Sequence, residues 1–217
     1  EMNRGVTTWP LMWSAVENSS GSASTVNEAS TALASAYLRF EMEEQASPGF
    51  RGEFNLNAQT EIPGITGFGS NSLAKAGTSV NLQWQGEAWA LGLKPAYAHD
   101  PDDDEELRLD GSYLAGTLGN WVFGAGAIDR WWGPGWQSSL ILSNNARPIP
   151  SVWMNRKDTH APESSWLGWI GPWDFTVLAG QYESDRAVPD AKLIGMRFTF
   201  RPMDGLDVGL SRAIMFG

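Results

Sequence analysis

Hydrophobic and polar residues alternate with a period of two along most of the chain after about residue 36. In one example, Phe54, Leu56 and Ala58 alternate with polar neighbours between residues 53 and 59. Successive side chains of a β-strand point to opposite faces, so this period predicts strands with one apolar and one polar face. The same pattern occurs at residues 37–43, 80–85, 121–125, 175–179, 194–201 and 208–212. We therefore predict an all-β, antiparallel fold of roughly ten strands.

A helical period precedes these strands. Thr25 and Glu28 have the spacing of a capping box, in which two side chains satisfy the first free N–H groups of a helix. Apolar residues then recur at helical intervals, at positions 26, 29, 32, 33 and 36. This predicts one short helix that ends near Ser35. The residues before it, 4–16, are apolar and contain two tryptophans, which predicts a packed entry segment.

The connections between the predicted strands differ in length, and this favours a barrel. Gly119-Asn120 is a tight turn, whereas residues 63–72 and 100–106 form longer loops. Outer-membrane barrels combine short turns at one end with longer loops at the other. The polar faces are rich in Asn, Gln, Arg and Glu, which suit a water-filled interior. The same alternation also fits a two-layer β-sandwich with one wet face, so this alternative stays open.

The chain is predicted to form a single domain over residues 1–217. We find no internal repeat and no second domain boundary, and we divide the domain into residues 1–34, with the helix, and residues 35–217, with the strands and loops. The predicted sheet ends in a strand at residues 208–217, where an open edge would need covering. We therefore expect the chain to be an incomplete part of a longer protein.

Composition excludes several classes of site. The chain has 15 Lys+Arg and 25 Asp+Glu, a formal charge of −10, which argues against nucleic acid as a partner. It has no cysteine, and His99 and His160 lie far apart, so we expect no thiolate chemistry, no disulfide, no metal site and no cofactor. The acidic run at residues 100–106 lacks the glycine that a tight calcium loop uses, which favours a solvated hairpin tip.

Tryptophan is unusually frequent, with 12 residues in 217. It suits membrane interfaces and sugar-stacking surfaces, because it joins a large apolar ring to one N–H donor. Five tryptophans are candidates for an interfacial belt or, alternatively, for ordinary core: Trp9, Trp13, Trp166, Trp169 and Trp173.

The densest local signal lies at residues 128–156, where the alternation stops. Three indoles surround a Gly-Pro-Gly turn, next to charged and amide side chains. Indoles stack on sugar rings, and arginine pairs with sugar carboxylates, so this segment is a candidate polysaccharide-binding site. Its candidate residues are Asp129, Arg130, Trp131, Trp132, Trp136, Asn144 and Arg147. The competing interpretation is a loop folded into the core, with Asp129 bridging Arg130 or Arg147.

The chain resembles the capsule assembly protein Wzi family. The resemblance rests on DRWWGPGWQSSLILSNNARPIP at residues 129–150, TTWPLMW at 7–13 and SRAIMFG at 211–217. It extends from about Val6 to Gly217 and corresponds to the N-terminal half of a family member. It implies an outer-membrane β-barrel of about 18 strands, of which this chain is about half, with a short helical plug at its N-terminal side. The implied function is attachment of capsular polysaccharide or exopolysaccharide to the cell surface, without catalysis.

We therefore expect a protein of the cell outer membrane, in contact with lipid, that binds an acidic polysaccharide and does not cleave it. A negatively charged protein needs localised cations to hold a polyanion, and Arg130, Arg147, Arg156 and Lys157 are close in sequence. A soluble β-sandwich carbohydrate-binding module is the main alternative. A glycoside hydrolase is less favoured, because no spacing singles out a pair of catalytic carboxylates.

Overall fold

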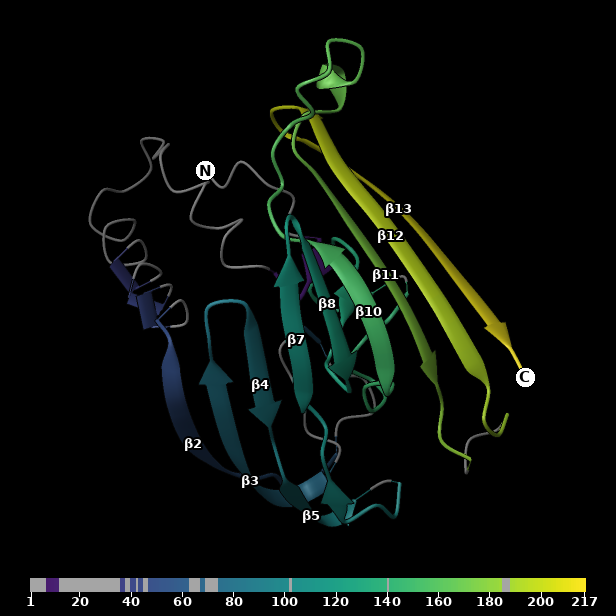
Figure 1. The fold of residues 1–217 in the computed structure, drawn as a ribbon. Coiled ribbons are helices and arrows are strands. Elements are labelled where there is room, and N and C mark those ends of the chain that lie inside the picture. Colours follow the sequence, from purple (N-terminus) through teal and green to yellow (C-terminus); the bar gives the residue numbers. More distant parts are fainter. Residues whose placement is uncertain are drawn as a thin grey trace.

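The fold is dominated by one large antiparallel sheet (Figure 1). The structure is a computed structural model that describes residues 7–11, 36–37, 40–41, 43–44, 47–62, 67–68, 74–101, 103–139, 141–184 and 188–217. The sheet has 11 strands, which confirms the all-β antiparallel prediction. They are β2 Gly49–Ala58, β3 Ala74–Gln85, β4 Trp89–Leu93, β5 Ala96–Pro101, β6 Leu107–Arg108, β7 Tyr113–Leu118, β8 Trp121–Gly126, β10 Ser151–Arg156, β11 Trp173–Gln181, β12 Lys192–Met203 and β13 Leu206–Phe216.

The first predicted strand is wrong. In the range 37–43 the described residues are helical, as are the neighbouring positions 36 and 44, and the large sheet begins at Gly49. The alternation of Phe40 with charged neighbours therefore did not indicate a strand. The helix predicted before residue 35 lies outside the described residues. Within the described ranges, no helix has the length and apolar character needed to cross a bilayer.

The strands follow one another as neighbours across most of the sheet. Their order is β13-β12-β11-β10-β8-β7-β4-β3, and β3 also pairs with β5 and, on its other edge, with β2. In the described part of the chain the sheet is open, because β2 pairs only with β3 and β13 only with β12. The described residues therefore form a curved sheet and not a closed barrel.

The two ends of the strands differ in their connections. Three tight turns, at residues 86–88, 119–120 and 204–205, lie at one end, which we call the short-turn rim. The connections at residues 127–150 and 182–191 lie at the opposite end, which we call the long-loop rim. One long connection, residues 157–172, lies at the short-turn rim, so the predicted asymmetry holds for most connections but not for all.

The two faces of the sheet have different side chains. Register places Phe175 opposite Phe198 and Val177 opposite Met196, in apolar rows that are partly exposed. The outward face is defined by these rows, which comprise Val152, Met154, Phe175, Val177, Ala179, Ile194, Met196, Phe198 and Phe200. Arg212 is a charged exception on this face, opposite Met196. The period of two thus separates an apolar outward face from an inward face.

The core lies on the inward face. Trp132 is fully buried and packs with Trp153, Leu178 and Leu193, which come from β10, β11 and β12. Two of these indoles lie directly over glycine. A Cβ atom added to Gly124, opposite Trp153 in the register, would stand 2.3 Å from the Trp153 ring. The strand glycine is required there because the indole occupies the space of its missing side chain.

Aromatic rings gather on the outward face at the short-turn rim. Trp173 and Phe198 have ring centroids 5.8 Å apart, and Trp121 and Phe175 have centroids 6.4 Å apart. The guanidinium of Arg156 lies 3.7 Å over the Trp173 ring. Rings with one apolar side and a nearby cation suit the boundary between hydrocarbon and water.

Candidate functional site

The segment that follows β8 folds into the concave side of the sheet. Its two-residue strand β9, Trp131–Trp132, pairs with β1, Thr8–Trp9, so that Thr8 lies opposite Trp132. The amide of Gly133 also donates to the carbonyl of Thr7 over 3.0 Å. The N-terminal segment and the tryptophan-rich segment, more than a hundred residues apart in sequence, therefore meet inside the fold.

Arg197 fixes this meeting point. It lies on the inward face of β12 and is buried. Its Nε donates to Thr8 Oγ1 over 2.6 Å, and another guanidinium nitrogen donates to the Thr7 carbonyl over 2.9 Å. Its remaining nitrogen donates to Ser211 Oγ on β13 over 2.6 Å. Our sequence interpretation placed residues 194–201 in an alternating strand but did not identify Arg197 as a functional residue.

The three tryptophans of the segment occupy different environments. Trp132 is 0% exposed and Trp131 is 2% exposed, whereas Trp136 is 59% exposed. The indole nitrogen of Trp131 donates to the carbonyl of Gly135 over 2.8 Å, which closes the Gly-Pro-Gly turn. Trp131 and Trp132 therefore offer no open ring to a sugar, and for these two the core interpretation applies. Of the three, only Trp136 has an accessible face.

Phe68 joins the exposed and buried tryptophans. Its ring lies 4.7 Å from that of Trp9, 5.9 Å from Trp131 and 5.0 Å from Trp136, measured between centroids. Its amide also donates to the Trp136 carbonyl over 2.7 Å. Trp9 thus belongs to the interior and not to an interfacial belt. Trp13 lies outside the described residues, while Trp166 and Trp169 are exposed in the 157–172 connection.

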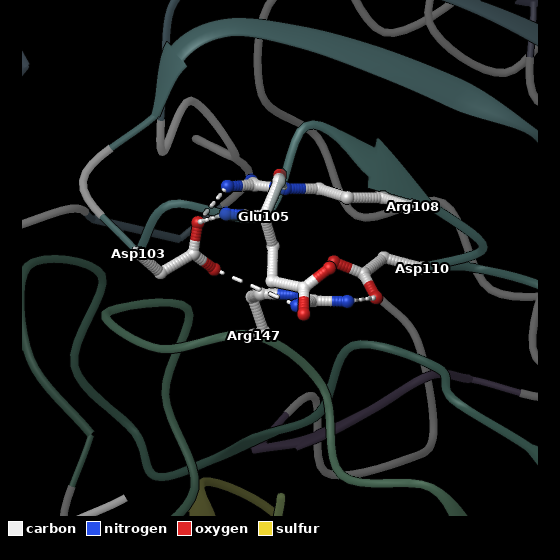
Figure 2. A network of polar contacts seen from close by, with 5 residues as sticks. All are labelled: Asp103, Glu105, Arg108, Asp110 and Arg147. Atoms are coloured by element: carbon white, nitrogen blue, oxygen red, sulfur yellow. Dashed lines mark hydrogen bonds and ion pairs between the residues drawn. The ribbon is translucent and has the colours of Figure 1, made fainter. Parts of the chain in front are cut away.

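Arg147 ties the tryptophan-rich segment to the acidic loop (Figure 2). It donates two hydrogen bonds to the carboxylate of Asp110, over 2.8 and 3.1 Å, and a further nitrogen lies 3.6 Å from Asp103. Asp103 in turn pairs with Arg108. The hydrogen bonds from Arg147 to Asp110 raise the pKa of the guanidinium above its ordinary value. The Arg147 side chain is mostly buried, so this network fixes the 103–110 loop over the tryptophan-rich segment.

The acidic run is only in part the solvated hairpin tip that we predicted, because residues 104–106 are exposed but two other carboxylates of the run form ion pairs. Asp103 is held by two arginines, and Asp100 forms an ion pair of 2.6 Å with Lys75. Asp102 lies outside the described residues. Among the residues that the structure does describe, no group of three or more histidine, aspartate or glutamate side chains is arranged to hold a metal ion.

The predicted cluster of four cations is wrong, because the cations separate. Arg147 and Arg130 line the same cavity near the long-loop rim. Arg156 lies at the opposite end of β10, where it covers Trp173 and donates to its carbonyl over 3.2 Å. Lys157 follows it, with its amide bonded to the Asn120 carbonyl at the short-turn rim. Adjacency in sequence was misleading because an extended strand of six residues lies between the two pairs.

Arg130 and Asp129 lie side by side in the wall of that cavity, which has a volume of about 230 Å³. Arg130 is 9% exposed, and its guanidinium lies 4.9 Å from the centre of the Trp153 ring. Burial lowers the pKa of Arg130 to about 10, so it stays charged at neutral pH. Burial raises the pKa of Asp129, an effect that nearby Lys94 opposes. Asn144, the remaining candidate, is buried.

The chain is similar to known proteins in both sequence and fold. The sequence model of the capsule assembly protein Wzi family matches residues 34–217. The chain belongs to the Wzi family. Its fold resembles a solved structure of Wzi from Escherichia coli, an outer-membrane protein involved in group 1 capsule assembly and described as a carbohydrate-binding β-barrel. The TM-score is 0.88 at 30% identity, over 100% of this chain and 49% of that one.

A second relative comes from Klebsiella pneumoniae. It is an uncharacterized 55.8 kDa protein in the cps region, 30% identical over 217 residues. The match covers 98% of this chain and 42% of that protein. The chain thus spans less than half the length of both relatives, which fits the open sheet edges at β2 and β13.

Proposed function

We propose that this chain forms part of an outer-membrane β-barrel that binds a capsular or extracellular polysaccharide and holds it at the cell surface without cleaving it. The observation that carries the proposal is the similarity of the whole chain, at a TM-score of 0.88, to a carbohydrate-binding barrel of capsule assembly. Family membership over residues 34–217 agrees with it.

The apolar outward face supports the membrane part of the proposal. Its rows of Phe, Val, Ile and Met are partly exposed, and among the described residues no second sheet covers them. A soluble β-sandwich would bury such a face against another layer. A barrel exposes it to lipid, with aromatic rings such as Trp121 and Trp173 at the boundary.

We also propose that the N-terminal residues 1–34 plug the end of the barrel at the short-turn rim. The described piece of this segment, residues 7–11, already lies inside the sheet, where Arg197 and β9 bind it. A barrel of this size needs an obstruction in its interior if it is not to leak. The long-loop rim would then face the outside, and with it the segment at residues 127–150.

The glycan contact is assigned to the part of the candidate site that is accessible at that rim. Trp136 offers an open indole face. Asp129, Arg130 and Arg147, which belong to the same segment of the chain, line a cavity. Indole stacking and charge-assisted hydrogen bonds are the usual means of binding acidic sugars. Trp131, Trp132 and Asn144 support this surface from below.

The test is capsule retention by cells that lack the gene and carry a plasmid copy. The intact protein should restore cell-bound polysaccharide, and Trp136→Ala should shift much of it into the culture medium, both measured as uronic acid. Trp169→Ala is the matched control, since Trp169 is 64% exposed in the 157–172 connection at the other rim. Full retention without any copy of the protein would refute the proposed function.

A further inference from the structure

We infer that the cavity beside Arg130 is a binding site for a single carboxylate-bearing sugar residue, with Arg130 as the group that recognises the carboxylate. The inference rests on the proposed function and deepens it, because it names the chemical class of sugar and the point at which it is held. It follows from the bonding of the arginines near the long-loop rim.

Arg130 has a hydrogen-bonding nitrogen left over. One terminal nitrogen of its guanidinium is buried, and no residue that the structure describes accepts a hydrogen bond from it. Trp153 contacts the guanidinium through its ring and provides no hydrogen-bond acceptor for this nitrogen. A buried cation without an accepting group is costly, so a site of this kind is built to receive one.

Arg147 lines the same cavity but is already neutralised. Its two hydrogen bonds to Asp110 and its approach to Asp103 occupy the guanidinium. Arg108 is likewise paired, with Asp103, and the guanidinium nitrogens of Arg197 are bonded to Thr8, Thr7 and Ser211. Among the arginines of this rim that the structure describes, Arg130 is therefore the one with a buried guanidinium nitrogen that no acceptor meets.

The remaining walls select the anion. The cavity is smaller than the roughly 300–1,000 Å³ of sites for drug-sized ligands, so it admits one sugar residue and not a folded oligosaccharide. Leu142, Ile149 and Leu178 supply apolar walls for the C–H face of a ring. Asp129 can accept hydrogen bonds from sugar hydroxyls, and its negative charge disfavours a doubly charged phosphate.

The test measures binding of methyl glucuronide to the intact protein in detergent, by calorimetry or saturation-transfer NMR. Methyl glucoside has the same ring without the charge, and inorganic phosphate has the charge without the ring. We expect the glucuronide to bind about tenfold or more tightly than either, because a hydrogen-bonded ion pair replaces an unbonded cation. Arg130→Gln should abolish this preference.

Arg201→Gln is the matched control. It removes the same charge from a hairpin ion pair with Asp207 and should leave the preference unchanged. If Arg130→Gln fails to fold, Ala146→Trp serves instead, because Ala146 is an exposed residue of the cavity wall and the larger side chain should block entry.

Equal binding of glucuronide and glucoside, or a preference that survives both Arg130→Gln and Ala146→Trp, would overturn the inference. In either case capsule retention by the intact protein would still be observed if the proposed function holds. If the intact protein binds glucuronide as expected but cells that carry it do not retain capsule, the proposed function alone is contradicted.

Discussion

Trp132→Ala should destabilise the fold far more than Trp136→Ala, although the two residues lie in one short segment. Trp132 is 0% exposed and packs on Trp153, Leu178 and Leu193, whereas Trp136 is 59% exposed. Loss of a fully buried tryptophan costs about 3–5 kcal/mol. A tryptophan side chain has about 200 Å² of surface, of which Trp136 buries less than half. This burial stabilises the fold by about 2 kcal/mol at most.

The assay is urea unfolding of the intact protein in lipid vesicles, followed by circular dichroism and by the heat-dependent shift in gel mobility. Trp132→Ala should lower the midpoint by an amount equivalent to about 3–5 kcal/mol. Trp136→Ala should lower it by the equivalent of about 2 kcal/mol at most and should affect glycan retention instead. Equal midpoints for the two variants would refute the assignment of Trp132 to the core.

Two other predictions concern charged groups of the tryptophan-rich segment. Arg147→Gln should leave Asp110 without its ion pair, lower the free energy of unfolding by about 1–3 kcal/mol and expose the 103–110 loop to an aspartate-specific protease. Arg147→Lys should protect the loop partly. Equal cleavage of the intact protein and both variants would contradict the network. Burial raises the pKa of Asp129, so its ionisation opposes folding, and stability should fall as pH rises from the unfolded value of about 3.9 through the raised folded value. Urea midpoints across this range should therefore decline for the intact protein relative to Asp129→Asn, and parallel pH profiles would rule out the effect.

Much of the sheet could be predicted from the alternation of side chains. Strands such as β8, β11 and β12 were found because their apolar residues occupy every second position and one face is uniformly apolar. The same rule failed at residues 37–43, where three alternating apolar residues fit a strand and the described positions are helical. Short alternating runs are ambiguous because a helix can also place two of three such residues on one side.

The candidate site was predictable as a segment but not residue by residue. Aromatic and charged residues at 129–147 marked it, yet Trp131 and Trp136 have the same side chain and differ only in what covers them. Phe68 and Arg197 were missed because they are distant in sequence from the residues they bind. No local pattern reports such contacts.

The sequence by itself determined where most strands lie, which of their faces is apolar, and that one tryptophan-rich segment interrupts them. These properties depend on local backbone geometry, in which each side chain's direction follows from its position. The tertiary structure alone decided which arginine is neutralised and which stays available. Arg147 meets Asp110 and Arg130 meets Trp153 only after the acidic loop and β10 have closed around them, because the energy of a charge depends on its neighbours in space.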